Sequence, residues 1–157
     1  MLPDNLRERP VAAAVEAFDS DAIQTGKLER GELTLEIAPA KITSVCGFLK
    51  YDQKFVRLSS VTAVDWYPSE PRFEVVYHLH SVERNERIRL KCRLPGSAAE
   101  IDSVTGVWRG ANWYEREVFD LFGITFRNHP DLRRIMMPDD WEGHPLRKDF
   151  PVTGTRV

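Results

Sequence analysis

Residues 87–94 alternate strictly between basic and apolar side chains. The apolar positions are Ile88, Leu90, Cys92 and Leu94, and the basic positions are Arg87, Arg89, Lys91 and Arg93. Because successive side chains of a β-strand point to opposite faces, this pattern predicts a strand with one buried and one solvent-facing side. Residues 73–79 have the same period, and Asn85 lies in the connection between the two segments. The two strands are therefore predicted to pair in an antiparallel sheet with one wet face.

Other segments supply further elements for this sheet. Residues 11–18 follow Pro10, which suits a first helical turn. A second helix is predicted to open at Pro39, since its apolar residues recur at helical spacing on one face: Ile42, Val45, Cys46 and Leu49. Residues 23–28 and 33–37 predict a hairpin, and residues 55–66 predict another strand. We predict an α+β fold, with a mostly antiparallel sheet and helices packed on one face.

The pattern changes after Gly96. Residues 97–100 have the form of a capping box and predict a short helix. Residues 112–122 predict another helix that stops at Gly123. Beyond Phe126 the periodicity is lost, and recurring prolines exclude a long helix. We predict a single domain over residues 1–126, followed by an extended C-terminal docking tail over residues 127–157.

The bulk composition limits the partners. The formal net charge is −2, whereas nucleic acid or an anionic membrane surface as the main partner requires a basic excess. Cys46 and Cys92 lie in apolar patterns without CxxC spacing, which favours buried thiols and a reducing compartment. No apolar run is long enough for a membrane span, and the start resembles neither a signal nor a transit peptide. These features predict a cytoplasmic chain that reaches a membrane only through partners.

Two features of the predicted sheet have competing interpretations. The basic face of residues 87–93 could bind phosphate or an acidic partner, but a solvated strand face is favoured because exposed faces are usually charged. His78 and His80 lie on one face of their strand and could hold zinc. Zinc sites need three or four ligands, so an ordinary surface pair is favoured.

The predicted helix over residues 112–122 carries several acidic groups. Arg116 and Asp120 are four residues apart and can pair, while Glu117 shares a face with Asp120. The tail carries Arg133, Arg134, Arg147 and Lys148, and we expect Arg133 and Arg147 in particular to neutralise buried carboxylates. A metal site is the alternative, and its candidate ligands are Glu115, Glu117, Asp120, His129 and His144. The intervening prolines and arginines argue against that site.

The tail combines irregular backbone with side chains that are typical of interface cores. These side chains are Leu132, Met136, Met137, Trp141, Leu146 and Phe150, together with the basic residues Arg133, Arg134, Arg147 and Lys148. A segment that cannot form a core of its own but is rich in such side chains is best explained if it orders against another surface. The alternative is a tail that folds over its own domain.

A long, uninterrupted signature in this region resembles a known family. It comprises Glu115-Arg116-Glu117, residues 120–124, Phe126, residues 129–135 and residues 142–151. These residues are similar to the 30 kDa subunit family of NADH dehydrogenase, the C subunits of bacterial NADH:quinone oxidoreductase (respiratory complex I). A weaker likeness extends back to residues 62–65, so about the last hundred residues are covered.

The resemblance implies a non-catalytic subunit of a proton-translocating NADH:quinone oxidoreductase. It implies a place in the peripheral arm, on the cytoplasmic side of the bacterial inner membrane. The tail would run over the large subunit that lines the quinone cavity, with iron–sulfur subunits nearby. The complex uses FMN, iron–sulfur clusters and quinone, and this chain is expected to bind none of them. The residues expected to form the interface or its support are Glu115, Arg116, Glu117, Asp120, His129, Pro130, Leu132, Arg133, Arg134, Trp141, His144, Pro145, Leu146, Arg147, Lys148, Asp149 and Phe150.

Two other functions remain open. A homologous subunit of a membrane-bound nickel–iron hydrogenase or a formate hydrogenlyase-type complex has the same kind of chain, and the flanking genes would distinguish it. A stand-alone metal-dependent enzyme would use His129, His144 and the acidic residues, and metal analysis of the purified chain would reveal it.

Overall fold

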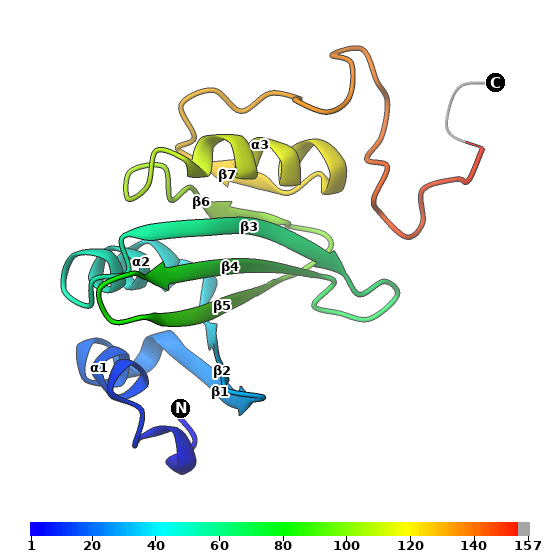
Figure 1. The fold of residues 1–157 in the computed structure, drawn as a ribbon. Helices are drawn as coiled ribbons and strands as arrows, with labels where there is room; N and C mark the ends of the chain where they lie inside the picture. The colour runs from blue at the N-terminus through cyan, green and yellow to red at the C-terminus, as the bar shows by residue number, and fades with distance from the viewer. Residues whose placement is uncertain (154–157) are drawn as a thin grey trace.

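The computed structural model describes residues 1–153, and its centre is a five-stranded sheet (Figure 1). The strands are β1 (Ile23–Glu29), β2 (Glu32–Ile37), β3 (Arg57–Asp65), β4 (Phe73–Ser81) and β5 (Glu86–Leu94). Their order is β1-β2-β5-β4-β3, and every neighbouring pair is antiparallel except β2 and β5. The predicted α+β class with a mostly antiparallel sheet is confirmed.

The alternation in β4 and β5 sets the buried face of the sheet. Ile88, Leu90, Cys92 and Leu94 are buried, as are Phe73, Val75, Tyr77 and Leu79 opposite them. Two helices join this core from the first part of the chain, α1 (Pro10–Phe18) and α2 (Ile42–Tyr51). The predicted apolar face of α2 is fully buried, and both cysteines are free and buried. Short 3-10 turns precede or separate these elements, at Asp4–Leu6, Ser20–Ala22 and Pro39–Lys41.

The strand predicted over residues 55–66 is shorter in the structure. Lys54 has a left-handed backbone with φ 65°, and the Phe55 N–H donates to the Leu49 carbonyl at the end of α2. Phe55 is therefore a buried part of the connection after α2, and β3 begins two residues later.

The helix predicted at residues 97–100 is wrong. The chain makes a turn in which the Ala98 N–H donates to the Pro95 carbonyl, and then enters β6 (Glu100–Asp102). This strand pairs in parallel with β7 (Thr125–Arg127). A capping box is a local signal, whereas the pairing involves a segment about 25 residues further along the chain, and the long-range pairing prevails.

Helix α3 (Ala111–Phe122) packs against β3 and connects β6 to β7 (Figure 1). It ends at Gly123, as predicted, and this residue has a left-handed backbone with φ 77°. Glycine adopts this conformation without steric cost. The turn returns the chain along α3.

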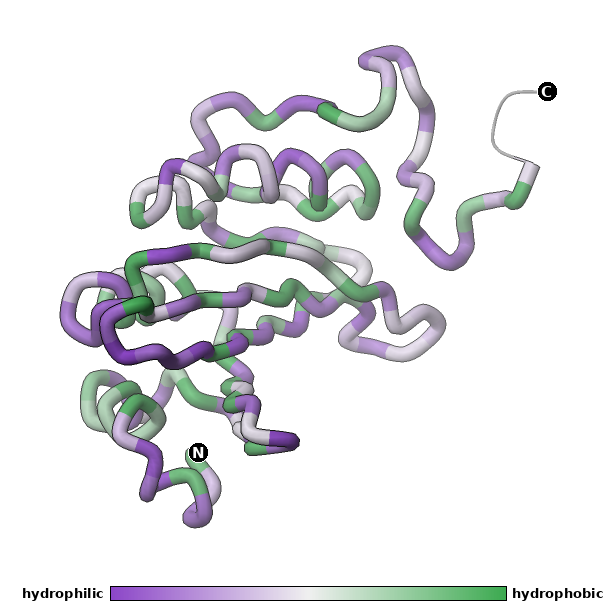
Figure 2. The backbone as a smooth tube through the Cα atoms, viewed as in Figure 1, coloured by the Kyte–Doolittle hydropathy of each residue, from purple (hydrophilic) through white to green (hydrophobic). Residues whose placement is uncertain are grey.

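Residues 128–153 contain neither helix nor strand (Figure 1). The stretch first passes over the outside of α3 and then descends past the end of the helix towards the connection between β3 and β4. The Leu146 N–H donates to the Leu121 carbonyl at 3.0 Å, so this stretch touches the helix directly. Apolar and polar residues are interspersed along the stretch (Figure 2). Among the described residues, no helix has the length and apolar character that a membrane crossing requires.

Candidate functional site: the junction of α3 and the C-terminal tail

Asp120, on α3, is the centre of the junction. One of its carboxylate oxygens accepts the backbone N–H groups of Ile135, Met136 and Met137 at 3.1, 2.7 and 2.8 Å. The other accepts from the Arg134 guanidinium at 2.7 Å, and the side chain is 0% exposed. Burial by itself would raise the pKa of Asp120, but these four donors together lower it. A buried, ionised carboxylate thus fixes the backbone over residues 135–137 and the side chain of Arg134.

Arg116 reinforces the same contact from one turn earlier. Its Nε and Nη2 atoms donate to the carbonyl oxygens of Arg133 and Arg134, each at 3.1 Å. The guanidinium also lies over the Trp113 ring, 5.4 Å from its centroid. The predicted pair between Arg116 and Asp120 does not form, because both side chains bind the tail instead.

The C-terminal end of α3 is covered by His144 and Arg147. His144 Nδ1 lies 2.9 Å from the Asp120 carbonyl oxygen, and Arg147 Nε donates to the Phe122 carbonyl at 2.6 Å. These side chains satisfy carbonyls that a helix end leaves without intrahelical partners. A Cβ at Gly123 would lie 2.5 Å from Arg147 and 2.7 Å from His144. The turn therefore needs glycine for its space as well as for its backbone conformation.

His129 occupies the opposite end of α3. Its Nε2 lies 3.3 Å from the Asn112 carbonyl oxygen and its Nδ1 accepts the Asp131 N–H at 3.0 Å. The tautomer consistent with both contacts carries its proton on Nε2. The two His-Pro pairs of the sequence thus contact the two ends of one helix.

Glu115 lies inside the domain beside His129. Its oxygens accept from Ser103 Oγ at 2.6 Å and from the Val104 N–H at 2.7 Å, and His129 Nε2 is 4.0 Å away. Burial raises the pKa of Glu115 to about 7, although the hydrogen bonds from Ser103 and Val104 oppose the shift. Glu117 is exposed, so it shares neither the burial nor the contacts of Asp120.

A second anchor holds the far part of the tail, and sequence reasoning missed two of its residues. Arg72, just before β4, donates to the Asp65 carboxylate at 2.8 and 2.9 Å and to Asp149 at 2.7 Å. The Lys148 N–H donates to Asp65 at 2.8 Å. The sequence shows only that Asp65 lies near the end of a predicted strand. It does not indicate that Asp65 contacts Lys148, which is 83 residues away.

We expect Asp65 to make the free energy of unfolding fall measurably in acid. The Arg72 guanidinium lowers the pKa of Asp65 from 3.8 to about 2, with help from the Lys148 and Tyr67 N–H groups. Because the folded pKa lies below the unfolded one, the stabilisation is present above about pH 4 and is lost as the pH falls towards 2. The expected loss is about 2 kcal/mol relative to Asp65→Asn. Denaturant unfolding of both proteins at pH 5 and pH 2.5 measures it, and parallel pH profiles would contradict it.

The arginines expected to neutralise buried carboxylates were wrongly chosen. Arg133 is exposed and pairs with Asp131, which is also exposed, at 2.8 Å. Arg147 contacts a carbonyl and lies over the Phe73 ring, 5.3 Å from its centroid. Arg134 and Arg72 fill the predicted role. The expectation named the correct kind of interaction but the wrong side chains.

The remaining residues that were expected at the interface differ in how far they are buried. Leu132 packs against the core, and Trp141, Pro145 and Phe150 are half-buried. Pro130, Leu146 and Lys148 are exposed. The alternative metal site was disfavoured by the sequence, and within residues 1–153 no three His, Cys, Asp or Glu side chains converge on one point.

The fold and the junction define an α+β domain that holds a helix-free C-terminal segment on its surface through buried charges. Residues 35–156 match the family described as respiratory-chain NADH dehydrogenase, 30 Kd subunit, and the chain belongs to that family. It is 52% identical over 126 residues to the C subunit of the NADH-quinone oxidoreductase of Geobacter sulfurreducens, covering 80% of this chain and 78% of the relative.

The solved structures that share this fold include the following two. The trypsin-resistant fragment of Nqo5 superposes with a TM-score of 0.69 at 28% identity, over 80% of this chain and 99% of the fragment. A chain of the membrane-bound sulfane sulfur reductase, an archaeal respiratory membrane complex, superposes with a TM-score of 0.79 at 30% identity. This match covers 93% of the chain and 86% of its counterpart.

Proposed function

We propose that this chain is a non-catalytic subunit of the peripheral arm of a proton-translocating NADH:quinone oxidoreductase. Its tail docks on the large subunit that lines the quinone cavity, with the iron–sulfur subunits nearby. FMN, iron–sulfur clusters and quinone are bound by other subunits. The chain lies on the cytoplasmic side of the bacterial inner membrane and reaches the membrane only through the complex. Family membership and the geometry of the tail support this proposal.

The observation that carries the proposal is a fixed backbone with outward-facing apolar side chains. Asp120 holds the Met136 N–H, yet the Met136 side chain is 63% exposed. Trp113, Ile135 and Leu146 are exposed at 60%, 38% and 52%. We call these four residues the docking set. A segment that is ordered before it binds loses less conformational entropy on association, and methionine and aromatic side chains are enriched at interfaces.

The match to the sulfane sulfur reductase favours a second candidate. That protein is a respiratory membrane complex named for the reduction of sulfane sulfur, and one of its chains shares the fold at 30% identity. The second candidate is therefore a homologous subunit of a different respiratory membrane complex, such as the hydrogenase-type complexes that the resemblance leaves open. The genes that flank this one distinguish the two, since each complex requires its own set of partner subunits.

Met136→Asp tests the docking role of the tail. The substitution places a charge on an apolar contact that becomes buried when the tail docks. We expect it to lower the recovery of the large subunit with this chain about tenfold, which corresponds to about 1.4 kcal/mol. Tyr51→Asp is the matched control, because Tyr51 is also 63% exposed but lies at the end of α2. Recovery is measured by co-purification from cells that express the whole complex.

Deletion of residues 128–157 extends the test to the whole tail. Recovery of the large subunit is expected to be lost. Unchanged recovery with the deletion, or an equal loss in Met136→Asp and Tyr51→Asp, would contradict the proposal.

A further inference from the structure

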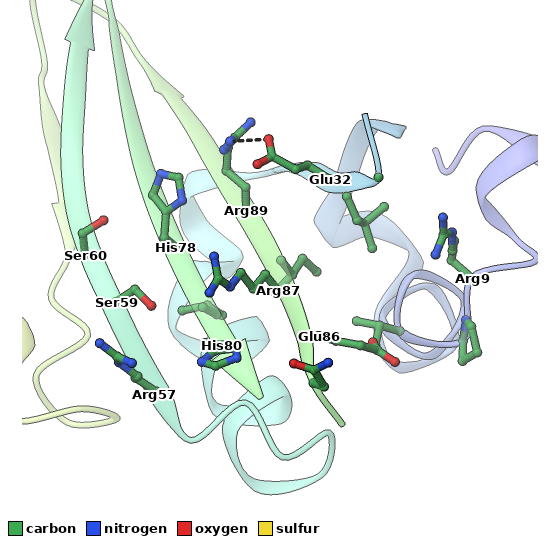
Figure 3. Close-up of a pocket in the computed structure, with 17 residues that line it drawn as sticks. Arg9, Glu32, Arg57, Ser59, Ser60, His78, His80, Glu86, Arg87 and Arg89 are labelled. Atoms are coloured by element: carbon green, nitrogen blue, oxygen red, sulfur yellow. Dashed lines mark hydrogen bonds and ion pairs between the residues drawn. The ribbon is translucent and has the colours of Figure 1, made fainter. Parts of the chain in front are cut away.

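The outer face of the sheet carries a cavity of about 830 Å³ whose polar walls are mainly basic (Figure 3). We call it the basic pocket and define it by Arg9, Arg57, His78, His80, Arg87 and Arg89. The pocket lies away from the junction, and none of the contacts described there involves these residues. Two acidic residues, Glu32 and Glu86, also line it.

Strand register arranges the basic side chains in two rows. Arg57, His80 and Arg87 are direct partners across β3, β4 and β5. Ser60, His78 and Arg89 form a second row, two residues along β4 and β5. Direct partners on neighbouring strands lie about 5 Å apart, and the rows are about 7 Å apart along a strand. Figure 3 shows both rows on the same side of the sheet.

Charge pairing divides the basic face of β5 into two halves. Lys91 and Arg93 share the buried carboxylate of Glu74 at 3.3 and 3.6 Å. Arg89 pairs with Glu32 at 2.9 Å. By contrast, no ion pair involves Arg57 or Arg87 within residues 1–153. Within residues 1–153, therefore, the positive charges of Arg57 and Arg87 are not neutralised by an ion pair, whereas the charge of Arg89 is.

The donors in the pocket are suited to carboxylates. They belong to guanidinium, imidazole and hydroxyl side chains on regular strands, and guanidinium binds carboxylate through two parallel hydrogen bonds. Dedicated phosphate sites usually add a concave nest of backbone N–H groups, whereas the central strands of this wall use their backbone N–H groups in the sheet ladder. Because the chain is a subunit of a complex, another subunit is available to supply the carboxylates.

We propose that the basic pocket binds an acidic segment of a partner subunit. An extended segment with carboxylates at positions i and i+2 has the spacing of the rows, about 7 Å. One carboxylate lies between Arg57 and Arg87, and the other lies over Ser60 and His78. The inference uses the chain's membership of a multi-subunit complex and is independent of where the tail docks.

Zero-length coupling in the intact complex tests this inference directly. Arg87→Lys introduces an amine that a carbodiimide joins only to a carboxylate in contact with it, and the product is mapped by mass spectrometry. The expected product is an amide bond to an Asp or Glu of another subunit. Arg109→Lys is the control, because Arg109 is exposed and lies outside the pocket. Coupling only to Glu32 or Glu86 of this chain, or no coupling, would overturn the inference.

Two further measurements distinguish an acidic partner segment from the alternatives. The double variant Arg57→Glu and Arg87→Glu is expected to lower the amount of this chain retained in the complex about tenfold at low salt, while Arg109→Glu leaves it unchanged. Equal retention overturns the inference. Binding of inorganic phosphate to the wild-type chain that the double variant abolishes, together with no coupling product in the intact complex, would assign the pocket to a phosphate-bearing ligand and also overturn it. Failure of the tail proposal leaves the coupling product in place, so the two outcomes are distinguishable.

Discussion

Replacing Asp120 with alanine is expected to lower the free energy of unfolding by about 3–5 kcal/mol. The substitution removes the acceptor for three backbone N–H groups of the tail and leaves Arg134 largely buried without its carboxylate. Buried donors without partners each carry a desolvation penalty. We also expect residues 135–137 to leave α3, since Asp120 accepts the backbone N–H group of each of them. Arg116 still contacts the carbonyl groups of Arg133 and Arg134 in this variant.

Denaturant unfolding measures the loss, and limited proteolysis reports the release of the tail. Asp131→Ala is the matched control, because Asp131 is an acidic residue of the same segment whose pair with Arg133 is exposed. Its expected effect is about 0.5 kcal/mol or less. A loss in Asp120→Ala no larger than in Asp131→Ala would show that the buried carboxylate does not hold the tail.

Glu115 is expected to make the stability of the protein fall between pH 5 and pH 8. Its pKa is about 7 in the folded chain, above the ordinary value of 4.5, so the folded state retains a proton that the unfolded chain has released. The contribution is fully present below about pH 4.5 and is lost as the pH rises through 7. The expected change is about 3 kcal/mol.

Glu115→Gln isolates this contribution, because the amide has nearly the same shape and does not titrate. Unfolding free energies of both proteins are measured at pH 5 and pH 8, and the difference between the proteins is compared. Taking the difference between the two proteins cancels the contributions of other titrating groups. One such group is His144, whose pKa is lowered by burial and whose contribution to the free energy of unfolding rises with pH instead of falling. If the wild-type protein and the variant have parallel pH profiles, Glu115 is ionised in the folded state throughout this range.

The sequence predicted those parts of the fold whose signals are local and periodic. The alternation in residues 87–94 identified β5 and its buried face, and the spacing of Ile42 to Leu49 identified the buried side of α2. The helix predicted at residues 97–100 failed because pairing with β7 depends on a segment that follows α3. Long-range pairing of this kind leaves no periodic signal in three residues.

The junction was predicted in kind but not in detail. The sequence indicated that carboxylates of α3 meet basic residues of the tail, and the structure brings Asp120 to Arg134. It could not distinguish Arg133 from Arg134, because that choice depends on the path of a backbone without regular structure. Arg72 and Asp149 are 77 residues apart, so their contact depends on the complete fold. The roles of both histidines follow from the length of α3, whose ends they contact.

The most direct test of the central claim is a photo-crosslink from the outward face of the tail. Met136→p-benzoylphenylalanine places the reactive group where Asp120 fixes the backbone and the side chain faces away from the domain. Irradiation of the intact complex is predicted to join this chain to the large subunit of the quinone cavity, whereas the same group at Tyr51 does not. Crosslinks from position 136 that remain within this chain, or that reach no other subunit, would contradict the claim that the tail is a docking segment.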